Sequence, residues 1–281
     1  MTDQPSAPSS VPAVPAVAIL GAGKIGEALL SGLLQAGRTA DSLMFTERYP
    51  ARCAELTEHY GVPAVTTEEA ARDADVLVVA VKPQDIDVLI EALATSITPG
   101  TLVVSLAAGI PTSVYERSLP TGTPVVRVMP NTALLVGEAM SAISGGAAAT
   151  DAHLALVEEM LTSVGKVVRV PESQQDAVTA LSGSGPAYFF FLVEAMIDAG
   201  ILLGLPRAVA SDLIIQSAVG AALMLRDSGE HPVSLREAVT SPGGTTIAAI
   251  RELENHGVRA ALLSAIEAAA LRSVELGAAH T

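Results

Sequence analysis

Short apolar runs alternate with amphipathic stretches along the first part of the chain, from about residue 14 to residue 170. Several of the runs, such as DVLVVAV, are apolar at successive positions, so a strand formed by them would be buried on both faces. Strands of this kind, separated by helical periodicity, predict a parallel sheet covered by helices on both sides. The expected strands are residues 14–20, 42–46, 75–81, 101–106, 124–129, 139–144 and 166–170, and the expected helices are residues 24–36, 50–60, 85–94 and 151–164, the last with Asp151 as N-cap.

The pattern changes after Pro171, where almost no strand signal remains. Helical periodicity continues to the end of the chain, interrupted at SGSGP (182–186), GLP (204–206), HP (231–232) and SPGG (241–244). We therefore expect an α/β domain over residues 14–171 and an all-α domain over residues 172–281. Segments such as AALLSAIEAAALRSVEL are apolar on more than one helix face, which is more than a small domain can bury on itself. This surplus predicts an intertwined homodimer.

The charge balance narrows the choice of partner. The chain carries 30 acidic and 16 basic side chains, a formal net charge of −14. Such a surface repels phosphate backbones, so no nucleic-acid binding is expected. An anionic substrate would need a local site of positive potential. No apolar run approaches the roughly 18 to 20 residues that a membrane-spanning helix needs, so a soluble protein is predicted.

Cysteine and histidine usage indicates a reducing compartment and no metal. Cys53 is the single cysteine, so no disulfide can form within the chain, and a cytoplasmic location is expected. The five histidines show no metal-ligand spacing, so no metal site is expected. The first 13 residues, MTDQPSAPSSVPA, have neither a basic segment nor an apolar one and are predicted to be a disordered tail rather than a signal peptide.

A glycine-rich GAGKIG motif follows the first predicted strand and opens a helix. Its first glycine permits a tight turn, the second lets backbone N–H groups approach a pyrophosphate, and the third allows close helix–strand packing. The phosphates would rest at the helix N-terminus, where the dipole and unpaired N–H groups favour an anion. The predicted cofactor contacts in this motif are Gly21, Ala22, Gly23, Lys24, Ile25 and Gly26.

The second predicted strand ends in Thr46-Glu47-Arg48. Glu47 lies where an acid would accept hydrogen bonds from the adenosine ribose of NAD, whereas Arg48 could pair with the 2′-phosphate of NADP. The two interpretations conflict, and each residue could also be a solvated charge. The choice between NADH and NADPH stays open at this point.

Three further loops follow the carboxyl ends of predicted strands, the edge at which open α/β sheets bind ligands. Small residues in two of them would let a nicotinamide ring lie close to the backbone. The third contains Asn131, which could contact the cofactor or cap a turn. The predicted contacts are Ala80, Val81, Lys82 and Pro83, then Leu106, Ala107 and Ala108, and finally Asn131.

In the predicted helical domain, SPGGTT at residues 241–246 opens a helix. Its glycines and hydroxyl residues could form a backbone N–H nest for a carboxylate. The alternative is an ordinary N-cap formed by Ser241 or Thr245, which composition alone favours. The sequence offers no recognisable Ser-His-Asp or Cys-His arrangement and no acidic pair tied to a shared loop. A dinucleotide site without such a dyad is typical of hydride transfer to an electrophilic carbon such as that of an iminium ion.

The motifs GAGKIGEALLSGLL, AVKP, SLAAG, RVMPNTALL, SGSGPAYFF, GLPR, HP and SPGGTTI occur in the order and spacing found in pyrroline-5-carboxylate reductases. The chain resembles this family from about residue 17 to residue 276. SGSGPAYFF and SPGGTTI are the motifs specific to this family, since related dehydrogenases share only the glycine-rich motif at the start of the chain.

The resemblance implies a fold and a reaction. The fold is an α/β Rossmann-type dinucleotide-binding domain followed by an all-α dimerisation domain. The reaction is the reduction of 1-pyrroline-5-carboxylate to L-proline by hydride from NADPH or NADH, the last step of proline biosynthesis. The resemblance also implies homodimers, often assembled into decamers, with each active site shared between subunits.

The resemblance assigns substrate contacts to the segment that begins at Ser241. Thr246 would hydrogen-bond the ring nitrogen, and the N–H groups of Gly244, Thr245 and Thr246 would hold the carboxylate. Glu172 matches a family position near the substrate. Two departures are Gly26, where many members have alanine, and Glu47, where the family often has serine or asparagine before the arginine. The second departure leaves a strict NADP preference unsupported.

Two other functions are possible for a chain of this pattern. β-Hydroxyacid dehydrogenases share this architecture but use a catalytic lysine after the linker, and this chain has no lysine after Lys166. A nonenzymatic NAD(P)-binding regulator would bind the cofactor without oxidising it in the presence of any cyclic imine.

Overall fold

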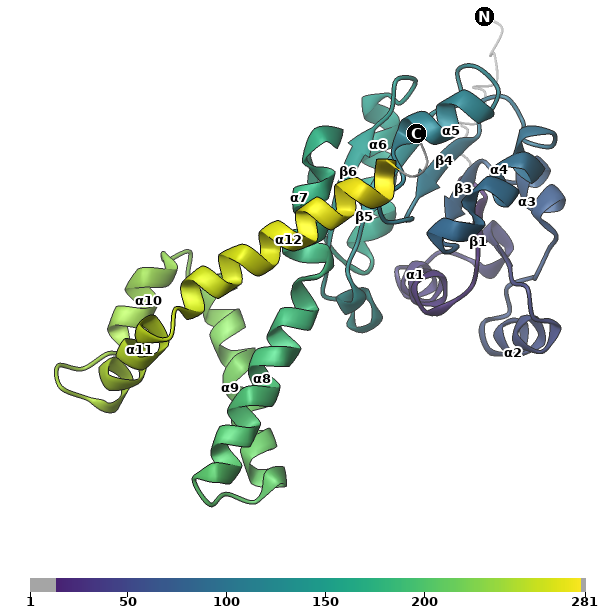
Figure 1. Ribbon diagram of the computed structural model, residues 1–281. Coiled ribbons are helices and arrows are strands. Elements are labelled where there is room, and N and C mark those ends of the chain that lie inside the picture. Colours follow the sequence, from purple (N-terminus) through teal and green to yellow (C-terminus); the bar gives the residue numbers. More distant parts are fainter. Residues whose placement is uncertain (1–13, 279–281) are drawn as a thin grey trace, which may run out of the picture. The chain divides into compact units, whose positions relative to one another are not determined.

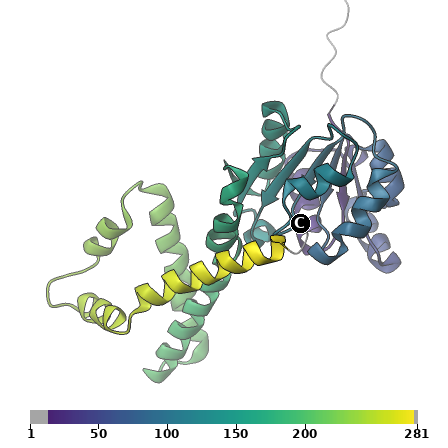
Figure 2. The same ribbon diagram turned by 45° about the horizontal axis from the view of Figure 1, so that its top comes forward.

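The computed structural model describes residues 14–278, so the predicted tail over the first 13 residues lies outside the described part of the chain (Figures 1 and 2). The chain divides into two compact units. The first contains the residues up to Gly183 together with those from Arg272 onward, and the second contains Ser184–Leu271. The last helix, α12 (Val258–Ala278), therefore contributes residues to both.

A seven-stranded sheet with the order β2-β1-β3-β4-β5-β6-β7 lies in the first unit (Figure 1). Strands β1 to β5 are parallel, whereas β6 runs antiparallel to β5, and β7 runs parallel to β6. The prediction of a parallel sheet is thus wrong for the last two strands. The strands are β1 (Val17–Leu20), β2 (Leu43–Thr46), β3 (Val76–Val79), β4 (Leu102–Ser105), β5 (Val125–Met129), β6 (Ala139–Gly145) and β7 (Gly165–Arg169).

The reversal at β6 has a simple cause. The connection from β5 to β6 holds only a short 3-10 helix, η3 (Thr132–Val136). A parallel return requires a crossover of about a dozen residues or more, whereas a shorter connection permits only an antiparallel neighbour. The pattern of apolar residues does not indicate strand direction. The antiparallel direction of β6 could be predicted only from the length of the connection that precedes it.

Both faces of the sheet are buried over β1, β3, β4 and β5, as predicted, whereas β7 has no buried residue. The helices of this unit are α1 (Lys24–Gln35), α2 (Pro50–Tyr60), α3 (Thr67–Asp73), α4 (Ile86–Ala94), α5 (Thr112–Ser118) and α6 (Asp151–Thr162), with short 3-10 helices η1 (Ala40–Ser42) and η2 (Pro83–Asp85). Along β1, Val17 and Ile19 belong to one apolar cluster, and Ala18 and Leu20 belong to the other. The first cluster includes residues of α1, α2 and α6, and the second includes residues of α3, α4 and α5.

Several local predictions need correction. Strands β1 and β3 are shorter than expected, because β1 begins only at Val17 and β3 ends at Val79. Helices α3 and α5 were not predicted; each has only seven residues, too few for a clear helical period. The N-cap of α6 is Thr150 rather than Asp151, and its side chain accepts a hydrogen bond from the backbone N–H of His153.

Residues 172–183 form an almost continuous helical stretch that leads into α8 (Gly185–Leu202). It consists of η4 (Glu172–Gln174), α7 (Gln175–Val178) and a π-helical turn, η5 (Thr179–Gly183). The predicted interruption at SGSGP is therefore wrong. Gly183 serves close packing instead, because a Cβ there would lie 2.4 Å from Met129 Cε. Single π turns inside helices occur frequently at functional sites.

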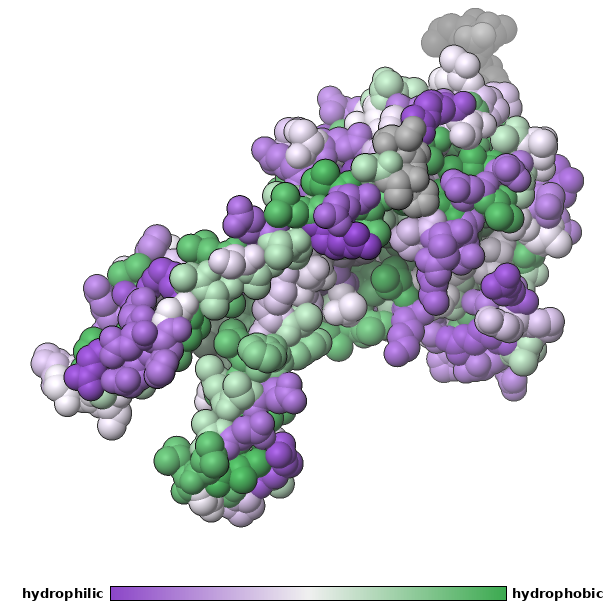
Figure 3. Space-filling view, viewed as in Figure 1, coloured by the Kyte–Doolittle hydropathy of each residue, from purple (hydrophilic) through white to green (hydrophobic). Residues whose placement is uncertain are grey.

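The second unit is helical throughout, as predicted. It contains α8, α9 (Arg207–Asp227), α10 (Pro232–Ala238), α11 (Thr245–Asn255) and the first part of α12. The expected interruptions at residues 204–206, 231–232 and 241–244 all separate helices. Large apolar side chains remain exposed in this unit; Phe189, Phe190 and Phe191 are 67%, 69% and 70% exposed. Apolar side chains also gather over the end of the α8–α9 pair (Figure 3).

Two helical stretches, Glu172–Leu202 and Arg207–Asp227, are long and apolar enough to cross a membrane by length and composition. The expectation that no segment reaches this threshold is therefore wrong. Neither stretch is an uninterrupted apolar run, because polar residues occur within both α8 and α9. Helices that pack against protein can have the same length and composition.

Candidate active site

The loops predicted to hold a dinucleotide lie at one edge of the sheet. Strands β2, β1, β3, β4 and β5 are parallel neighbours in that order, so their carboxyl ends meet at the same edge. The strand order reverses between β1 and β3, which is where open α/β sheets form a ligand crevice. Each of these five strands is followed by a predicted cofactor contact. In the sheet order β2, β1, β3, β4 and β5, the contacts are residues 47–48, 21–26, 80–83, 106–108 and 131.

The three motif glycines have different surroundings, and each fits its expected role. Gly21 has a φ of +97°, which favours glycine, and a Cβ there would lie 3.0 Å from Val81 Cγ1. A Cβ on Gly26 would lie 2.2 Å from the carbonyl oxygen of Gly21, so this position allows α1 to pack closely. A Cβ on Gly23 would meet no atom within 4 Å. Gly23 therefore leaves open space in front of the loop.

The start of α1 fits a pyrophosphate. Gly23 is its N-cap, and no side chain caps the helix. The loop is held from behind, because the backbone N–H groups of Gly21 and Ala22 donate to the Thr46 carbonyl oxygen at 3.1 and 3.0 Å. Uncapped N–H groups at a helix start, next to a position without a side chain, suit an anion. Lys24 is exposed as the first residue of this helix, and Ile25 is half-buried behind it.

The end of β2 presents both of the competing groups. Glu47 Oε1 accepts hydrogen bonds from the backbone N–H groups of Arg48 at 2.7 Å and Tyr49 at 3.2 Å, which fixes the carboxylate. Among the described residues, Glu47 Oε2 has no hydrogen-bond partner and the exposed Arg48 guanidinium has no ion-pair partner. A carboxylate oxygen suited to a ribose hydroxyl and a guanidinium suited to a 2′-phosphate therefore occupy consecutive positions.

The loops after β3 and β4 differ in exposure. Ala80, Val81 and Pro83 are half-buried and Lys82 is exposed, whereas Leu106 and Ala107 are buried and only Ala108 is half-buried. Leu106 and Ala107 can thus offer their backbone rather than their side chains to a ligand. This second loop is fixed from below, because Ser105 Oγ accepts from the Ala107 N–H at 3.3 Å and lies 2.8 Å from the Tyr115 hydroxyl.

Asn131 forms hydrogen bonds with three segments. Its Oδ1 accepts from the N–H groups of Ala133 at 3.2 Å and Met140 at 3.4 Å. Its Nδ2 donates to the Ser182 carbonyl oxygen in the π-helical turn at 3.2 Å. The capping interpretation of the sequence is confirmed, and the side chain also connects the end of β5 to the SGSGP motif.

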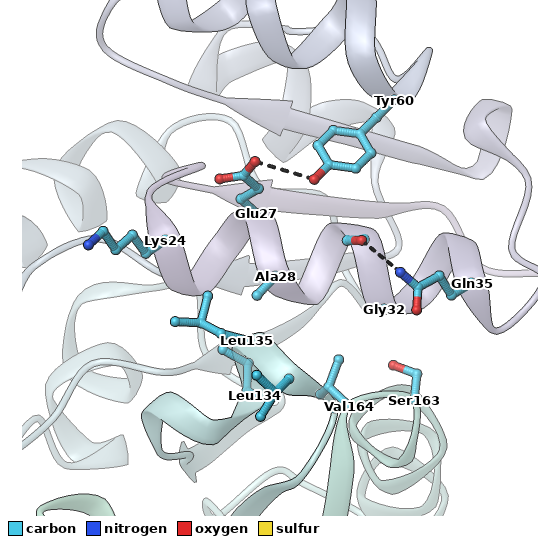
Figure 4. Close-up of a pocket in the computed structure, with 13 residues that line it drawn as sticks. Lys24, Glu27, Ala28, Gly32, Gln35, Tyr60, Leu134, Leu135, Ser163 and Val164 are labelled. Carbon is cyan, nitrogen blue, oxygen red and sulfur yellow. Dashed lines mark hydrogen bonds between the residues drawn. The ribbon is translucent and has the colours of Figure 1, made fainter. Parts of the chain in front are cut away.

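A groove of about 520 Å³ crosses the outer face of α1, between Tyr60 and the residues of η3 (Figure 4). Glu27 lies on this face, accepts a hydrogen bond from the Tyr60 hydroxyl at 3.3 Å and forms an ion pair with Arg52. Burial raises the pKa of Tyr60, and the Glu27 charge adds to that shift. Of the predicted cofactor contacts, only Lys24 lines the groove.

Glu172 lies in the first unit, beside the loop that follows β4. Its Oε1 and Oε2 accept hydrogen bonds from the N–H and the hydroxyl of Thr112, each at 2.8 Å. Its Oε1 also lies 3.4 Å from Arg127 Nη1. Both carboxylate oxygens therefore have protein partners. Sequence reasoning missed this cluster, although a single arginine inside the apolar strand VVRVM is a signal for a buried charge that needs partners.

The predicted substrate segment lies in the second unit, at the start of α11. Gly244 is the N-cap, and no side chain caps this helix, so the alternative of an ordinary N-cap by Ser241 or Thr245 is wrong. The Gly244 N–H donates to the Ser241 carbonyl oxygen at 3.1 Å in a turn that uses the positive φ of Gly243, +68°. Thr246 is half-buried, and its hydroxyl has no hydrogen-bond partner among the described residues.

Two family models match the chain. Residues 16–109 match the family described as NADP oxidoreductase coenzyme F420-dependent. Residues 172–276 match the family described as pyrroline-5-carboxylate reductase dimerisation. The second match includes the helices with large exposed apolar side chains and supports self-association of this chain through them.

Individual relatives agree with these models. A pyrroline-5-carboxylate reductase of Corynebacterium melassecola is 47% identical over 265 residues, which cover 93% of this chain and 98% of the relative. The structure of a pyrroline-5-carboxylate reductase from Coxiella burnetii is 34% identical with a TM-score of 0.89, covering 93% of this chain and 98% of that one. The Plasmodium falciparum pyrroline carboxylate reductase with NADP bound is 27% identical with a TM-score of 0.84, covering 94% of this chain and 98% of that one. With identity at this level over nearly the whole length, the chain belongs to the pyrroline-5-carboxylate reductase family.

Proposed function

We propose that this chain reduces 1-pyrroline-5-carboxylate to L-proline with NADPH or NADH. The observation that carries the proposal is the start of α11, an uncapped helix N-terminus next to a half-buried threonine hydroxyl without a protein partner. Neither feature stabilises the isolated helix, since an uncapped N-terminus leaves orphan N–H groups. Both suit a small substrate that carries a carboxylate beside a ring nitrogen.

We assign the cofactor to the sheet edge of the first unit. The uncapped start of α1 would hold the pyrophosphate, and the loops after β3 and β4 would flank the nicotinamide half. The reduced nicotinamide, when bound, supplies a hydride to the C=N carbon. The two electrons of that hydride form the new C–H bond, the C=N π electrons move to the nitrogen, and the nitrogen gains a proton or retains the one it carried as an iminium ion.

We assign substrate binding to residues 241–246. The N–H groups of Thr245 and Thr246 would hold the carboxylate, with the helix dipole favouring the negative charge. Gly244 would supply the N-cap geometry, since its own N–H donates to Ser241. Thr246 Oγ would hydrogen-bond the ring nitrogen, whose basicity rises as the hydride arrives. A contact that strengthens along this coordinate lowers the barrier instead of only tightening binding.

The activity is tested by initial rates with 1-pyrroline-5-carboxylate and each reduced cofactor. Oxidation of NADH or NADPH should require the imine and should yield L-proline in equal amount. A lack of turnover with both cofactors across neutral pH would end the proposal. The ratio of the two values of kcat/KM also decides which cofactor the Glu47–Arg48 pair favours.

We further propose that residues 14–171 bind the cofactor and that residues 172–281 form a homodimer, which can assemble into a decamer. The exposed apolar residues of α8 and α9 would then pack against a second copy rather than in a membrane, in a cytoplasmic protein that binds no nucleic acid. Sedimentation without detergent should give a dimer or a multiple of it. A folded monomer at low concentration, or a need for detergent, would contradict the assembly.

A further inference from the structure

A buried arginine holds together several elements of the first unit. Arg127 lies in the middle of β5, and its side chain is only 6% exposed. Its guanidinium has Glu172 at 3.4 Å and Asp176 at 3.9 Å. A charge in such a position is stable only with charged or hydrogen-bonding partners. Glu172 and Asp176 therefore hold the start of the 172–183 stretch against the sheet.

Glu172 completes helix α5 from a distant part of the chain. The N-cap of α5 is Pro111, whose side chain cannot cap the helix. The Glu172 carboxylate accepts from both the N–H and the hydroxyl of Thr112, the first residue of the helix, at 2.8 Å each. A carboxylate at this end satisfies an orphan donor and has a favourable interaction with the helix dipole. It thus performs the task that an N-cap side chain performs elsewhere.

Helix α5 in turn fixes the loop after β4. The Tyr115 hydroxyl lies 2.8 Å from Ser105 Oγ, and Ser105 Oγ accepts from the Ala107 N–H at 3.3 Å. Tyr115 is fully buried, and burial raises its pKa to about 12, so the hydroxyl stays protonated at neutral pH. The connection thus runs from Glu172 through α5 to the backbone of Ala107.

We propose that Glu172 is a positioning residue, which fixes α5 and, through Tyr115 and Ser105, the backbone of residues 106–108, and that it does not bind the substrate. Both of its oxygens already accept hydrogen bonds from Thr112, which fixes the carboxylate toward α5, and its negative charge would repel the carboxylate of the substrate. The inference rests on the proposed function, because it takes residues 106–108 as contacts of the cofactor.

Asp176 provides a matched control. It faces the same guanidinium, but its other partner is Ser273 near the end of α12, whose hydroxyl donates to Asp176 Oδ1 at 2.6 Å. Asp176→Asn weakens the pair with Arg127 and keeps an acceptor for Ser273, without touching Thr112. Glu172→Ala removes the contacts to Thr112. Both variants weaken the interaction with Arg127, and only Glu172→Ala also removes the contacts with Thr112. A difference between their effects therefore measures the contribution of the contacts with α5.

The experiment compares NADPH binding, measured by fluorescence titration, with hydrogen exchange of the amides in residues 105–115. For Glu172→Ala, the Kd for NADPH should rise about three- to thirtyfold, the range expected for loss of a helix cap, with faster exchange at Thr112 and Ala107. Asp176→Asn should change neither by more than about twofold. Equal changes in both variants, or an unchanged Kd with a raised KM for 1-pyrroline-5-carboxylate in Glu172→Ala, would overturn the proposal.

A second variant guards against misfolding. Thr112→Val removes only the hydroxyl donor and should raise the Kd for NADPH by a smaller factor. Because residues that act through one contact are not additive, combining it with Glu172→Ala should add nothing further. Additive effects would overturn the connection through Thr112. Binding is measured without the imine, so these results do not depend on turnover, whereas an inactive wild-type chain would refute the activity.

Discussion

Two helices of this protein begin in the same way and differ in what surrounds their first turn. Helix α1 has Gly23 as its N-cap and α11 has Gly244, and neither has a side-chain cap. The first turn of α1 offers backbone N–H groups and a lysine, whereas that of α11 carries Thr245 and Thr246. On the proposed assignment, the start of α1 binds the pyrophosphate with backbone N–H groups alone. The start of α11 binds the substrate carboxylate in the same way and also places a hydroxyl at the ring nitrogen.

The largest effect on activity is expected at Thr246, in the first turn of α11. Thr246→Ala should lower kcat by roughly tenfold to a thousandfold, as for loss of a positioned donor or proton-transfer group. The Kd for NADPH should not change, because the proposed cofactor contacts all lie in the first unit. Thr246→Ser retains the hydroxyl and should keep much of the activity. Steady-state rates and a thermal midpoint on each variant provide the check; an Ala variant with normal kcat would leave Thr246 as a helix residue only.

A methyl group at the start of α1 should act on binding. A Cβ at position 23 meets no protein atom within 4 Å, so Gly23→Ala should fold and lose at most about 1 kcal/mol of stability. The same methyl would occupy the space assigned to the pyrophosphate, so the Kd for NADPH should rise at least about tenfold. Fluorescence titration measures it.

The matched change at the second helix is Gly244→Ala. Its Cβ would lie 3.2 Å from the Ser241 carbonyl oxygen, and the change should raise the KM for the imine while NADPH binding stays normal. If the two alanine variants affected both ligands equally, the proposed division between the helix starts would be wrong.

Arg48→Ala tests how the chain distinguishes NADPH from NADH. Only NADPH offers a 2′-phosphate to the guanidinium, so its Kd should rise by roughly tenfold or more, corresponding to loss of about 1.5 to 3 kcal/mol for one charge-assisted contact. The Kd for NADH should stay within about twofold. Parallel titrations of both cofactors decide the matter, and equal losses would show that Arg48 does not contact that phosphate.

The smallest effect is expected at Asn131. Its three hydrogen bonds join η3, β6 and the π-helical turn. Asn131→Ala should therefore lower the free energy of unfolding by about 1 to 2 kcal/mol, as for loss of a cap. Denaturant unfolding gives this value. A normal stability combined with weaker NADPH binding would instead favour the direct cofactor contact that the sequence left open.

The sequence predicted those parts of the molecule in which a single local pattern determines structure. The apolar runs around Val78 and Val104 located buried strands, and GAGKIG located the first helix start, because glycine spacing alone satisfies that turn. The direction of β6 was missed because it follows from the length of a connection. The SGSGP interruption was predicted wrongly because Gly183 ends a π-helical turn and lies against Met129, a residue distant in sequence, rather than breaking the helix.

The candidate site was predictable to the same extent. The loops at the sheet edge follow from strand order, and the threonines of α11 follow from the resemblance. The environment of Glu172 does not follow from any local pattern, since its partners Thr112 and Arg127 lie 60 and 45 positions away. The resemblance assigned Glu172 to the surroundings of the substrate, and its contacts at the start of α5 became visible only in the structure.

The close contact at the end of the chain has a consequence for biosynthesis. A Cβ on Gly277 would lie 2.9 Å from the Gly109 carbonyl oxygen, and Ser273 donates to Asp176 across 97 positions. Residues 273–277, which are synthesised late, thus pack onto segments that are made much earlier. The nascent sheet can pair its strands before these residues are made, because domains generally fold as units during translation. The loop after β4 acquires its contact with Gly277 only once that residue has been made, so a chain truncated before Arg272 would lack this contact.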